Sequence, residues 1–363
     1  MIAIPQHQID RNIKAFAHKN LSAASNTKFS VLMILLVLVS AAQGRESVHS
    51  LASSPNDDTA LYRINTSVRQ LQEQFWKQGL EFIRQNKKKL RRTKCYLVID
   101  ETYESYTGNL HKKPLEELTP EQRTTRKHIH KYKPKNGDTG SFKYLVFAVV
   151  YQNKRHVLRV RALQRGESYW SFIVKTLDEI YREIKFDCAL MDRGFYVAEL
   201  VDLLEKKQIP YLIRAKLYDS MRSFYGIYSE WKAHDYLLDE RAKTKLVLGR
   251  DVSNKEWGFL TNLRIKNFPI FLTIYKKRWN IENIFKATDG IQLRVATSDH
   301  IKRLFAVCLS FIVYNSWQDW KNSFSLLGFM KKIVKIILRI IKTICPHRDR
   351  LKLNSPLWDF VQF

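Results

Sequence analysis

Three acidic residues, widely separated in the chain, have the types and settings of a shared metal site. Asp100 and Asp192 each follow a short apolar run, residues 96–99 and 188–191, of the kind that forms buried strands. In open α/β sheets, ligands and chemistry collect at the carboxyl ends of such strands. Glu282 comes from a helical stretch instead. Carboxylates that converge on divalent cations can activate water and stabilise a leaving oxygen, which points to phosphoryl transfer.

Glu282 lies in the stretch 275–286, which is expected to form one helix. At about 100° per residue, one face would carry cations, aromatic rings and Glu282, and the opposite face an apolar seam. The first face is Tyr275, Arg278, Trp279, Glu282 and Lys286, and the seam is Ile281, Ile284 and Phe285. An ordinary surface helix with ion pairs at i,i+4 spacing would look the same, and each pair contributes only about 0.2–0.5 kcal/mol. The helix alone does not decide between the two interpretations.

The three stretches together resemble an insertion-sequence transposase of the Asp-Asp-Glu type, which has an RNase H-like catalytic core. Asp100, Asp192 and Glu282 match the three metal ligands of that family in order. Tyr275, Arg278 and Glu282 match its Tyr-x2-Arg-x3-Glu signature. The family pattern continues to a Lys seven residues beyond the Glu, but position 289 is Asp here, and Lys286 is the nearest candidate to replace it. The resemblance covers roughly residues 94–320.

The resemblance implies a transposase that cuts DNA at the ends of a mobile element and transfers the freed strand into target DNA. Asp100, Asp192 and Glu282 would then be both catalytic residues and metal ligands. Their hard oxygen atoms suit Mg²⁺ or Mn²⁺ better than zinc, and two ions are expected.

DNA contacts are expected around the signature helix. Arg278 and Lys286 would contact terminal phosphates, and Tyr275 or Trp279 would stack on a base displaced from the duplex. Arg193, directly after the second aspartate, is a further candidate for DNA binding. The implied partner is double-stranded DNA, as terminal inverted repeats and as target. Cutting two ends together implies a homodimer in the DNA complex.

Nearby acidic residues compete for the same roles. Glu101 and Glu104 follow Asp100 closely, but the expected position at the end of a strand favours Asp100. Asp187 precedes its apolar run and should lie at the opposite end of the sheet from Asp192. Asp192 could also be an ordinary helix-capping residue.

The order of predicted elements is that of an RNase H-like core. Strand 96–100 is followed by a hairpin, 143–151 and 154–163, around Gln152-Asn153, then by a helix within 168–185 and by the strand that ends at Asp192. Gly194 is expected to relax the backbone where that strand turns into a helix at 196–207, and 209–215 reads as another buried strand. The fold class is therefore α/β: an RNase H-like mixed sheet with flanking helices, an N-terminal helical domain and a β-rich insertion before the catalytic Glu.

The predicted domains follow from this order. They are an N-terminal helical, DNA-binding domain at 1–92, the first part of the catalytic core at 93–215, a β-rich insertion at 216–268, the second part of the core at 269–322, and a basic tail at 323–363. In the N-terminal domain, the apolar stretch 31–39 resembles a signal-peptide core but is too short to span a bilayer, so a helix is expected there. Residues 45–70 have the outline of a helix-turn-helix, as many small helical bundles do.

Several polar and basic segments surround these domains. A helix at 59–85 is expected to lead into the basic run 87–92, either a solvated linker or a contact for DNA phosphates. The charged segment 111–139 is expected to be a functional or mobile loop, with His128 and His130 solvated. A core helix is expected at 300–319. The basic amphipathic helix at 328–345 could dock on the core, lie along DNA or bind an anionic membrane.

The overall charge favours a polyanionic partner. The 363 residues contain 62 Lys and Arg against 35 Asp and Glu, a formal net charge of +27. Nucleic acid is the first candidate, because neutralising phosphates releases counterions. The four cysteines are widely spaced and form no CxxC or Cys/His cluster, which argues against a zinc site and for a reducing compartment. The expected location is the cytoplasm of a prokaryote, at the nucleoid, without stable membrane association.

Three other functions remain open from the sequence. One is a metal-dependent nuclease that cuts DNA without joining it, and inverted repeats flanking the coding region would argue against it. Another is a DNA-binding protein derived from a transposase, although all three acidic positions are intact. The last is a membrane-associated protein built around 31–39 and the basic tail, which would sediment with lipid.

Overall fold

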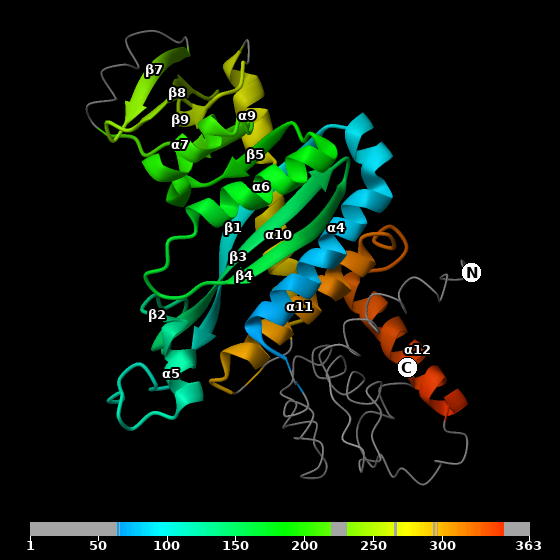
Figure 1. The fold of residues 1–363 in the computed structure, drawn as a ribbon. Coiled ribbons are helices and arrows are strands. Elements are labelled where there is room, and N and C mark those ends of the chain that lie inside the picture. The colour runs from blue at the N-terminus through cyan, green and yellow to red at the C-terminus, as the bar shows by residue number, and fades with distance from the viewer. Residues whose placement is uncertain are drawn as a thin grey trace.

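A nine-stranded mixed sheet organises the molecule (Figure 1). The computed structural model describes residues 64, 66–218, 231–264, 267–292, 295 and 297–344, without the side chains of residues 232 and 336–344. The expectations for 31–39, for most of the helix-turn-helix segment and for the end of the C-terminal tail concern residues outside these ranges. Among the described residues, the strands run in the order β2-β3-β1-β5-β6-β9-β8-β7, with β4 paired to β3.

The first half of the sheet has the predicted RNase H-like order, with β1 (Cys95–Tyr106), β3 (Gly140–Tyr151) and β4 (Lys154–Ala162) antiparallel. Strands β5 (Cys188–Met191) and β6 (Tyr211–Arg214) follow in parallel to β1. The predicted hairpin at Gln152-Asn153 is therefore confirmed. The first strand does not end at Asp100 as expected: its far half stays paired with β3 as far as Tyr106.

The β-rich stretch continues the same sheet beyond β6. Strand β9 (Glu256–Thr261) pairs antiparallel with β6, β8 (Ala242–Arg250) pairs with β9, and β7 (Lys232–Leu238) forms the far edge. The strands predicted for 216–268 are thus present, and they extend the central sheet. The domain boundaries themselves stay predictions.

Helices cover both faces of the sheet (Figure 1). Helices α6 (Trp170–Ile184) and α7 (Ala198–Lys206) share one apolar core with one set of strand residues. On the other face, α9 (Phe268–Lys276), α10 (Trp279–Asp289), α11 (His300–Trp317) and the start of α12 (Leu326–Ile344) share a second core. Helix α11 is the core helix that was expected at 300–319. The first turns of α12 dock on this core through Phe329, Met330, Ile333 and Val334.

Helix α4 (Val68–Arg92) lies against β4, the strand paired only with β3. A capping box formed by Ser67 and Gln70 fixes its start, which is later than the expected residue 59. The helix also continues through the basic run 87–92, so this run is not a linker. Gly79 allows close packing, because a Cβ there would lie 2.2 Å from the carbonyl oxygen of Leu158.

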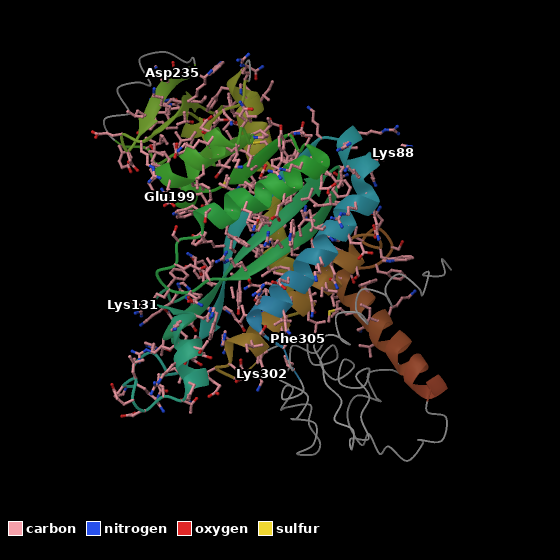
Figure 2. The ribbon with its side chains drawn as sticks, in the orientation of Figure 1. Lys88, Lys131, Glu199, Asp235, Lys302 and Phe305 are labelled. Atoms are coloured by element: carbon pink, nitrogen blue, oxygen red, sulfur yellow. The ribbon has the colours of Figure 1, made fainter. Side chains whose placement is uncertain are left out.

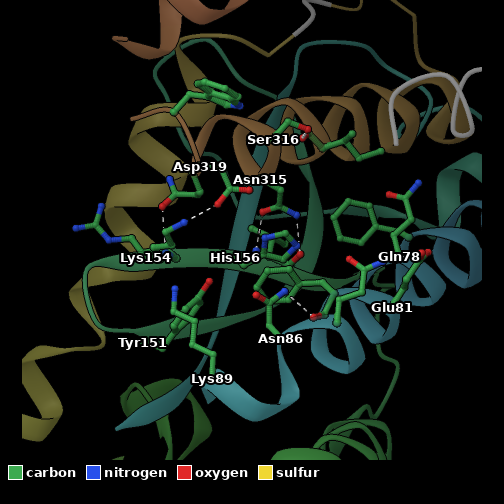
Figure 3. A pocket seen from close by; sticks show the side chains of 18 residues that line it. Gln78, Glu81, Asn86, Lys89, Tyr151, Lys154, His156, Asn315, Ser316 and Asp319 are labelled. Atoms are coloured by element: carbon green, nitrogen blue, oxygen red, sulfur yellow. Dashed lines mark hydrogen bonds and ion pairs between the residues drawn. The ribbon is translucent and has the colours of Figure 1, made fainter. Parts of the chain in front are cut away.

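The outer edge of β4 is closed by side chains of α11 and the residues after it. The Asn315 side chain accepts from the backbone N–H of Val157 and donates to its C=O, both at 2.8 Å. Gln318 accepts from the backbone N–H of Arg155 at 3.1 Å. Next to these contacts lies a polar cavity of about 400 Å³ between α4, β4 and α11 (Figure 3). Covering an edge in this way prevents it from pairing with another chain.

The charged segment 111–139 is ordered rather than an open loop. It contains α5 (Pro120–Lys127) and β2 (Ile129–His130), which pairs with β3. The expectation that its histidines are solvated is wrong for His128, which is 4% exposed and stacks on His300 with 4.5 Å between ring centroids. His130 is half-buried, and its Nε2 lies 3.1 Å from the carbonyl oxygen of Leu163.

Two further features are the state of the cysteines and the length and polarity of the helices. Cys95, Cys188 and Cys308 are buried and free, and Cys345 lies outside the described residues. In the part of the chain that the structure describes, no helix is long and apolar enough to cross a membrane.

Candidate active site

The parallel pairing of β1 with β5 brings the two aspartates to the same level of the sheet. The register joins Tyr96 to Cys188 and Val98 to Leu190, and two more residues along each chain lead to Asp100 and Asp192. Side chains two residues apart share a face of a strand. Val98 and Leu190 belong to the core that also contains Ile281 and Ile284 of α10. Both carboxylates are therefore on the α10 side of the sheet.

The predicted single helix at 275–286 is two helices with a break between them. Helix α9 ends at Lys276 and α10 begins at Trp279. Across the break, the backbone N–H groups of Lys277 and Arg278 bond to the carbonyl oxygens three residues earlier, the tighter 3₁₀ pattern. The one-helix prediction is wrong because Tyr275 belongs to α9 and points into the core, whereas Glu282 belongs to the first turn of α10.

Arg278, at the start of α10, joins two of the three acidic residues. Its Nη1 donates to Asp100 Oδ2 at 2.8 Å, and its Nη2 donates to Glu282 Oε1. The side chain of Arg278 is 11% exposed, that of Asp100 14% and that of Glu282 41%. A planar fork of donors is suited to two carboxylates at once. The i,i+4 pair expected from the sequence is thus present, and it extends to the first aspartate on β1.

The pKa of the Asp100 carboxyl is raised to about 7, which reflects its burial and the charges around it. Burial is the largest cause, and the negative charges of Asp192 and Glu282 act in the same direction, while Arg278 opposes them. Burial lowers the pKa of Arg278, but Tyr275, Asp100 and Glu282 outweigh this effect, so that the net shift is upward. The charges of Asp192 and Glu282 therefore act on Asp100, and the Arg278 guanidinium bonds to Asp100 and Glu282.

Asp192 has a structural role beside any chemical one. Its Oδ1 accepts from the backbone N–H of Gly194 at 2.7 Å and caps the 3₁₀ turn η2 (Arg193–Phe195). The capping alternative from the sequence is thus realised. Gly194 matters for a different reason than expected: a Cβ there would lie 3.0 Å from Asp192 Oδ1. This glycine makes room for the carboxylate.

The competing acidic residues are engaged elsewhere. Glu101 accepts from Tyr103 at 2.9 Å and pairs with Lys143 at 2.6 Å. Glu104 pairs with Arg303 of α11 at 2.9 Å. Asp187 accepts from the backbone N–H of Cys95 at the first residue of β1, which is the end of the sheet that the sequence predicted. These bonds leave Asp100 and Asp192 as the acidic residues shared by β1 and β5 at the α10 side.

The predicted DNA-binding residues are not all equally accessible. Tyr275 is 5% exposed and packs against Trp257 and Phe259, with ring centroids 6.1 and 5.1 Å away. Trp279 is 48% exposed, and both Lys286 and Arg193 are exposed. Base stacking, expected for either ring, is therefore open to Trp279 and not to Tyr275 as it is packed here.

Arg214 is a residue of this region that the sequence analysis missed. It is the last residue of β6, the strand next to β5, and its guanidinium lies 3.8 Å from the Trp257 ring centroid. Burial raises the pKa of Tyr275, while Arg278 and Arg214 lower it, so both cations lie near its ring. The rule that drew attention to the two aspartates, a polar residue at the carboxyl end of a buried strand, would also have found Arg214.

The donor set fits a hard divalent cation in its chemistry. It consists only of carboxylate oxygens, the ligands that Mg²⁺ and Mn²⁺ prefer. With Arg278 between Asp100 and Glu282, however, no three Asp, Glu, His or Cys side chains of the described ranges are grouped closely enough to hold an ion. The guanidinium supplies positive charge where a cation would be needed.

Sheet order, flanking helices and the position of the acidic residues define an RNase H-like α/β fold. Residues 119–316 match the family model described as a transposase DDE domain. This match covers more than half of the 363 residues, and the chain belongs to that family, so it is a transposase of the DDE type.

A solved structure with a similar fold is that of the piggyBac transposase in a synaptic complex with hairpin DNA. The two chains are 11% identical with a TM-score of 0.58, and the similarity covers 98% of this chain and 81% of the other. At this identity the likeness concerns the fold alone. No curated protein matches the sequence.

Proposed function

We propose that the protein cleaves DNA at the ends of a mobile element and joins the freed ends to target DNA. The observation that carries this proposal is the bond of Arg278 to both Asp100 and Glu282, with Asp192 near enough to raise the pKa of Asp100, in a chain of the transposase DDE family. Asp192 and Glu282 fall inside the matched residues 119–316, whereas Asp100 precedes them. The role of Asp100 therefore rests on its register with Asp192 and its bond to Arg278.

Asp100, Asp192 and Glu282 would together bind two divalent cations, either Mg²⁺ or Mn²⁺. When bound, such ions supply a Lewis acid for the phosphodiester and lower the pKa of the attacking hydroxyl or water. Arg278 would then release its carboxylates and bind a DNA phosphate, for which its fork of donors is equally suited. When Arg278 moves from the carboxylates to a phosphate, its positive charge would stay paired with an anion, and the carboxylates would be paired with the metal ions.

The remaining site residues would position the DNA. Trp279, exposed at the start of α10, would stack on a displaced base, and Lys286 and Arg193 would contact backbone phosphates. Tyr275 would support Arg278, whose guanidinium carbon lies 5.8 Å from the Tyr275 ring centroid. The partner is double-stranded DNA carrying terminal inverted repeats, bound by a homodimer, in the cytoplasm of a prokaryotic cell.

Cleavage of the repeat that flanks the coding region tests this function. The native chain and Asp192→Asn are compared with Mg²⁺ or Mn²⁺ in a gel assay, together with a binding assay on the same DNA. We expect the variant to lose cutting by at least about a hundredfold, with binding retained, because removing one ligand weakens metal binding without changing the cationic surface. If the native chain cuts the DNA but never joins it to a target, the nuclease function is favoured. Normal cutting by Asp192→Asn would refute the assignment of Asp192 as a metal ligand.

A further inference from the structure

A dense group of cations lies at the end of the sheet opposite the active site. It is formed by the last turns of α4, the residues that follow it and the C-cap of α6. We call it the basic end patch: Arg84, Lys87, Lys88, Lys89, Arg91, Arg92, Lys94 and Lys185. Lys88 projects from the end of α4 away from the sheet (Figure 2).

Few acidic groups balance this patch. Glu183 pairs with Lys87 at 2.8 Å and lies 3.9 Å from Arg84. Asp187 is also at this end, but it accepts from the backbone N–H of Cys95. Among the described residues, Lys88, Arg92 and Lys94 form no ion pair. The patch therefore has a large excess of positive charge.

Helix stability does not account for this composition. Cations favour a helix C-terminus only within its last turn. Arg84, Lys88 and Arg92 repeat at i,i+4 spacing, and like charges at this spacing are destabilising by about 0.2–0.5 kcal/mol per pair. Repulsion among these cations destabilises the free protein. Binding of an anionic partner would reduce this repulsion, which is a reason for the cations to be grouped here.

The shape of the patch favours DNA over a membrane surface. An interfacial helix needs an exposed apolar face. At this end of α4, Ile83 and Leu90 are at most 1% exposed because they face the sheet, and Phe82 packs partly buried against the same core. What remains outward is a row of cations about 6 Å apart along the helix, comparable with two phosphate steps of about 3.4 Å along one DNA strand.

The patch is separate from the active site. Lys94 directly precedes β1, and Asp100 lies six residues farther along the chain, about 20 Å away at about 3.3 Å per residue. Asp100 also faces α10, whereas α6 covers the other face of the sheet. The patch and the active site therefore lie at different levels of the sheet and on different faces of it.

We propose that the basic end patch binds the backbone of a second DNA segment, distinct from the segment that is cut. This inference rests on the proposed function, since it assumes a protein that handles more than one stretch of DNA. The contact is independent of base sequence, because long Lys and Arg side chains reach phosphates rather than base edges.

The test uses the full-length chain with Lys88→Gln, Arg92→Gln and Lys94→Gln combined. All three side chains are exposed, so folding should be unaffected. Binding to a short duplex of arbitrary sequence is measured by fluorescence anisotropy over a range of salt concentrations. We expect affinity to fall about tenfold or more and the slope of log K against log[salt] to decrease by about 2 to 3, as for the loss of three phosphate contacts.

A matched control removes the same charge elsewhere. Arg69→Gln, Lys206→Gln and Arg250→Gln remove three cations that are exposed but already paired with Glu73, Asp202 and Glu256. If both triple variants bind alike, net charge alone matters and the patch proposal is overturned. Unchanged DNA binding with lost binding to phosphatidylserine vesicles would overturn it in favour of a membrane. Cutting by Asp192→Asn is a separate result, so either proposal can fail while the other stands.

Discussion

Arg278 determines how the acidic residues are held in the free protein. It is 11% exposed and bonds to Asp100 and Glu282 at once, so removing it leaves a buried carboxylate beside two others. Breaking a buried pair by deleting one partner is much more costly than replacing both. The same side chain also gives the site its positive charge, so its loss should be partly compensated by a divalent cation.

Arg278→Gln should lower the free energy of unfolding by about 1–3 kcal/mol in the presence of a chelator, because Asp100 loses its charged donor. Mn²⁺ should then raise the Tm of the variant more than that of the native protein. Thermal unfolding with and without Mn²⁺ measures both effects. Arg278→Lys is the matched control, since it keeps the charge but loses the second donor. Equal Mn²⁺ responses in all three proteins would argue against a shared cation position.

At the level of elements, the contact between α4 and β4 depends on a single glycine. Gly79 lies in the middle of α4, where alanine would ordinarily favour a helix by about 1 kcal/mol. Its missing side chain lets the helix approach the backbone of Leu158. Steric fit and helix propensity therefore act in opposite directions at this position.

Gly79→Ala should destabilise the protein by about 1–3 kcal/mol, because a Cβ cannot occupy a point 2.2 Å from the Leu158 carbonyl oxygen unless α4 moves. Urea unfolding measures the change. Gly328→Ala in α12 is the control, since the nearest atom to its Cβ is the movable Ser325 Oγ at 3.1 Å. A stabilised Gly79→Ala protein would mean that α4 does not pack this closely on β4.

The stacked histidines join the α5 segment to α11 and should make stability sensitive to acid. The pKa of His128 is lowered from 6.5 to about 4, mainly by burial and also by His300. The unfolded chain therefore takes up a proton on this residue before the folded chain does. Stability from His128 is complete above about pH 6.5 and is lost as the pH falls toward 4.

Lowering the pH from about 7.5 to 5 should reduce the free energy of unfolding by about 2 kcal/mol through His128 alone. His128→Gln has no such proton to take up, so its unfolding free energy should fall less over the same range. Urea titrations of both proteins at the two pH values provide the comparison. An identical pH dependence would mean that His128 is not buried against His300.

For the whole molecule, local sequence patterns predicted the elements better than the way they meet. The apolar runs before Asp100 and Asp192 gave the strands, and the turn at Gln152-Asn153 gave the hairpin. Helical periodicity could not show the break at Arg278, because the residues of α9 and α10 have compatible spacing on either side of it. Helical spacing placed Tyr275 and Trp279 on the same face, so the two rings looked equivalent although one is 5% and the other 48% exposed.

The particular bonds between distant residues could not be read from the chain. The register between β1 and β5 and the bond from Arg278 to Asp100, 178 residues away, depend on how the sheet and helices pack. The burial of His128 is similar, because its partner His300 belongs to α11. The net charge of +27, a property of the whole molecule, is consistent with the proposed handling of DNA.

The central claim is that Asp100, Asp192 and Glu282 share divalent cations when DNA is bound. Anomalous diffraction from crystals of the DNA complex grown with Mn²⁺ tests it directly, because manganese can be located independently of the protein atoms. We predict anomalous peaks in contact with all three carboxylates, and Arg278 moved from Asp100 to a phosphate. Peaks at other residues, or an Arg278 still bonded to Asp100 and Glu282 in that complex, would contradict the account.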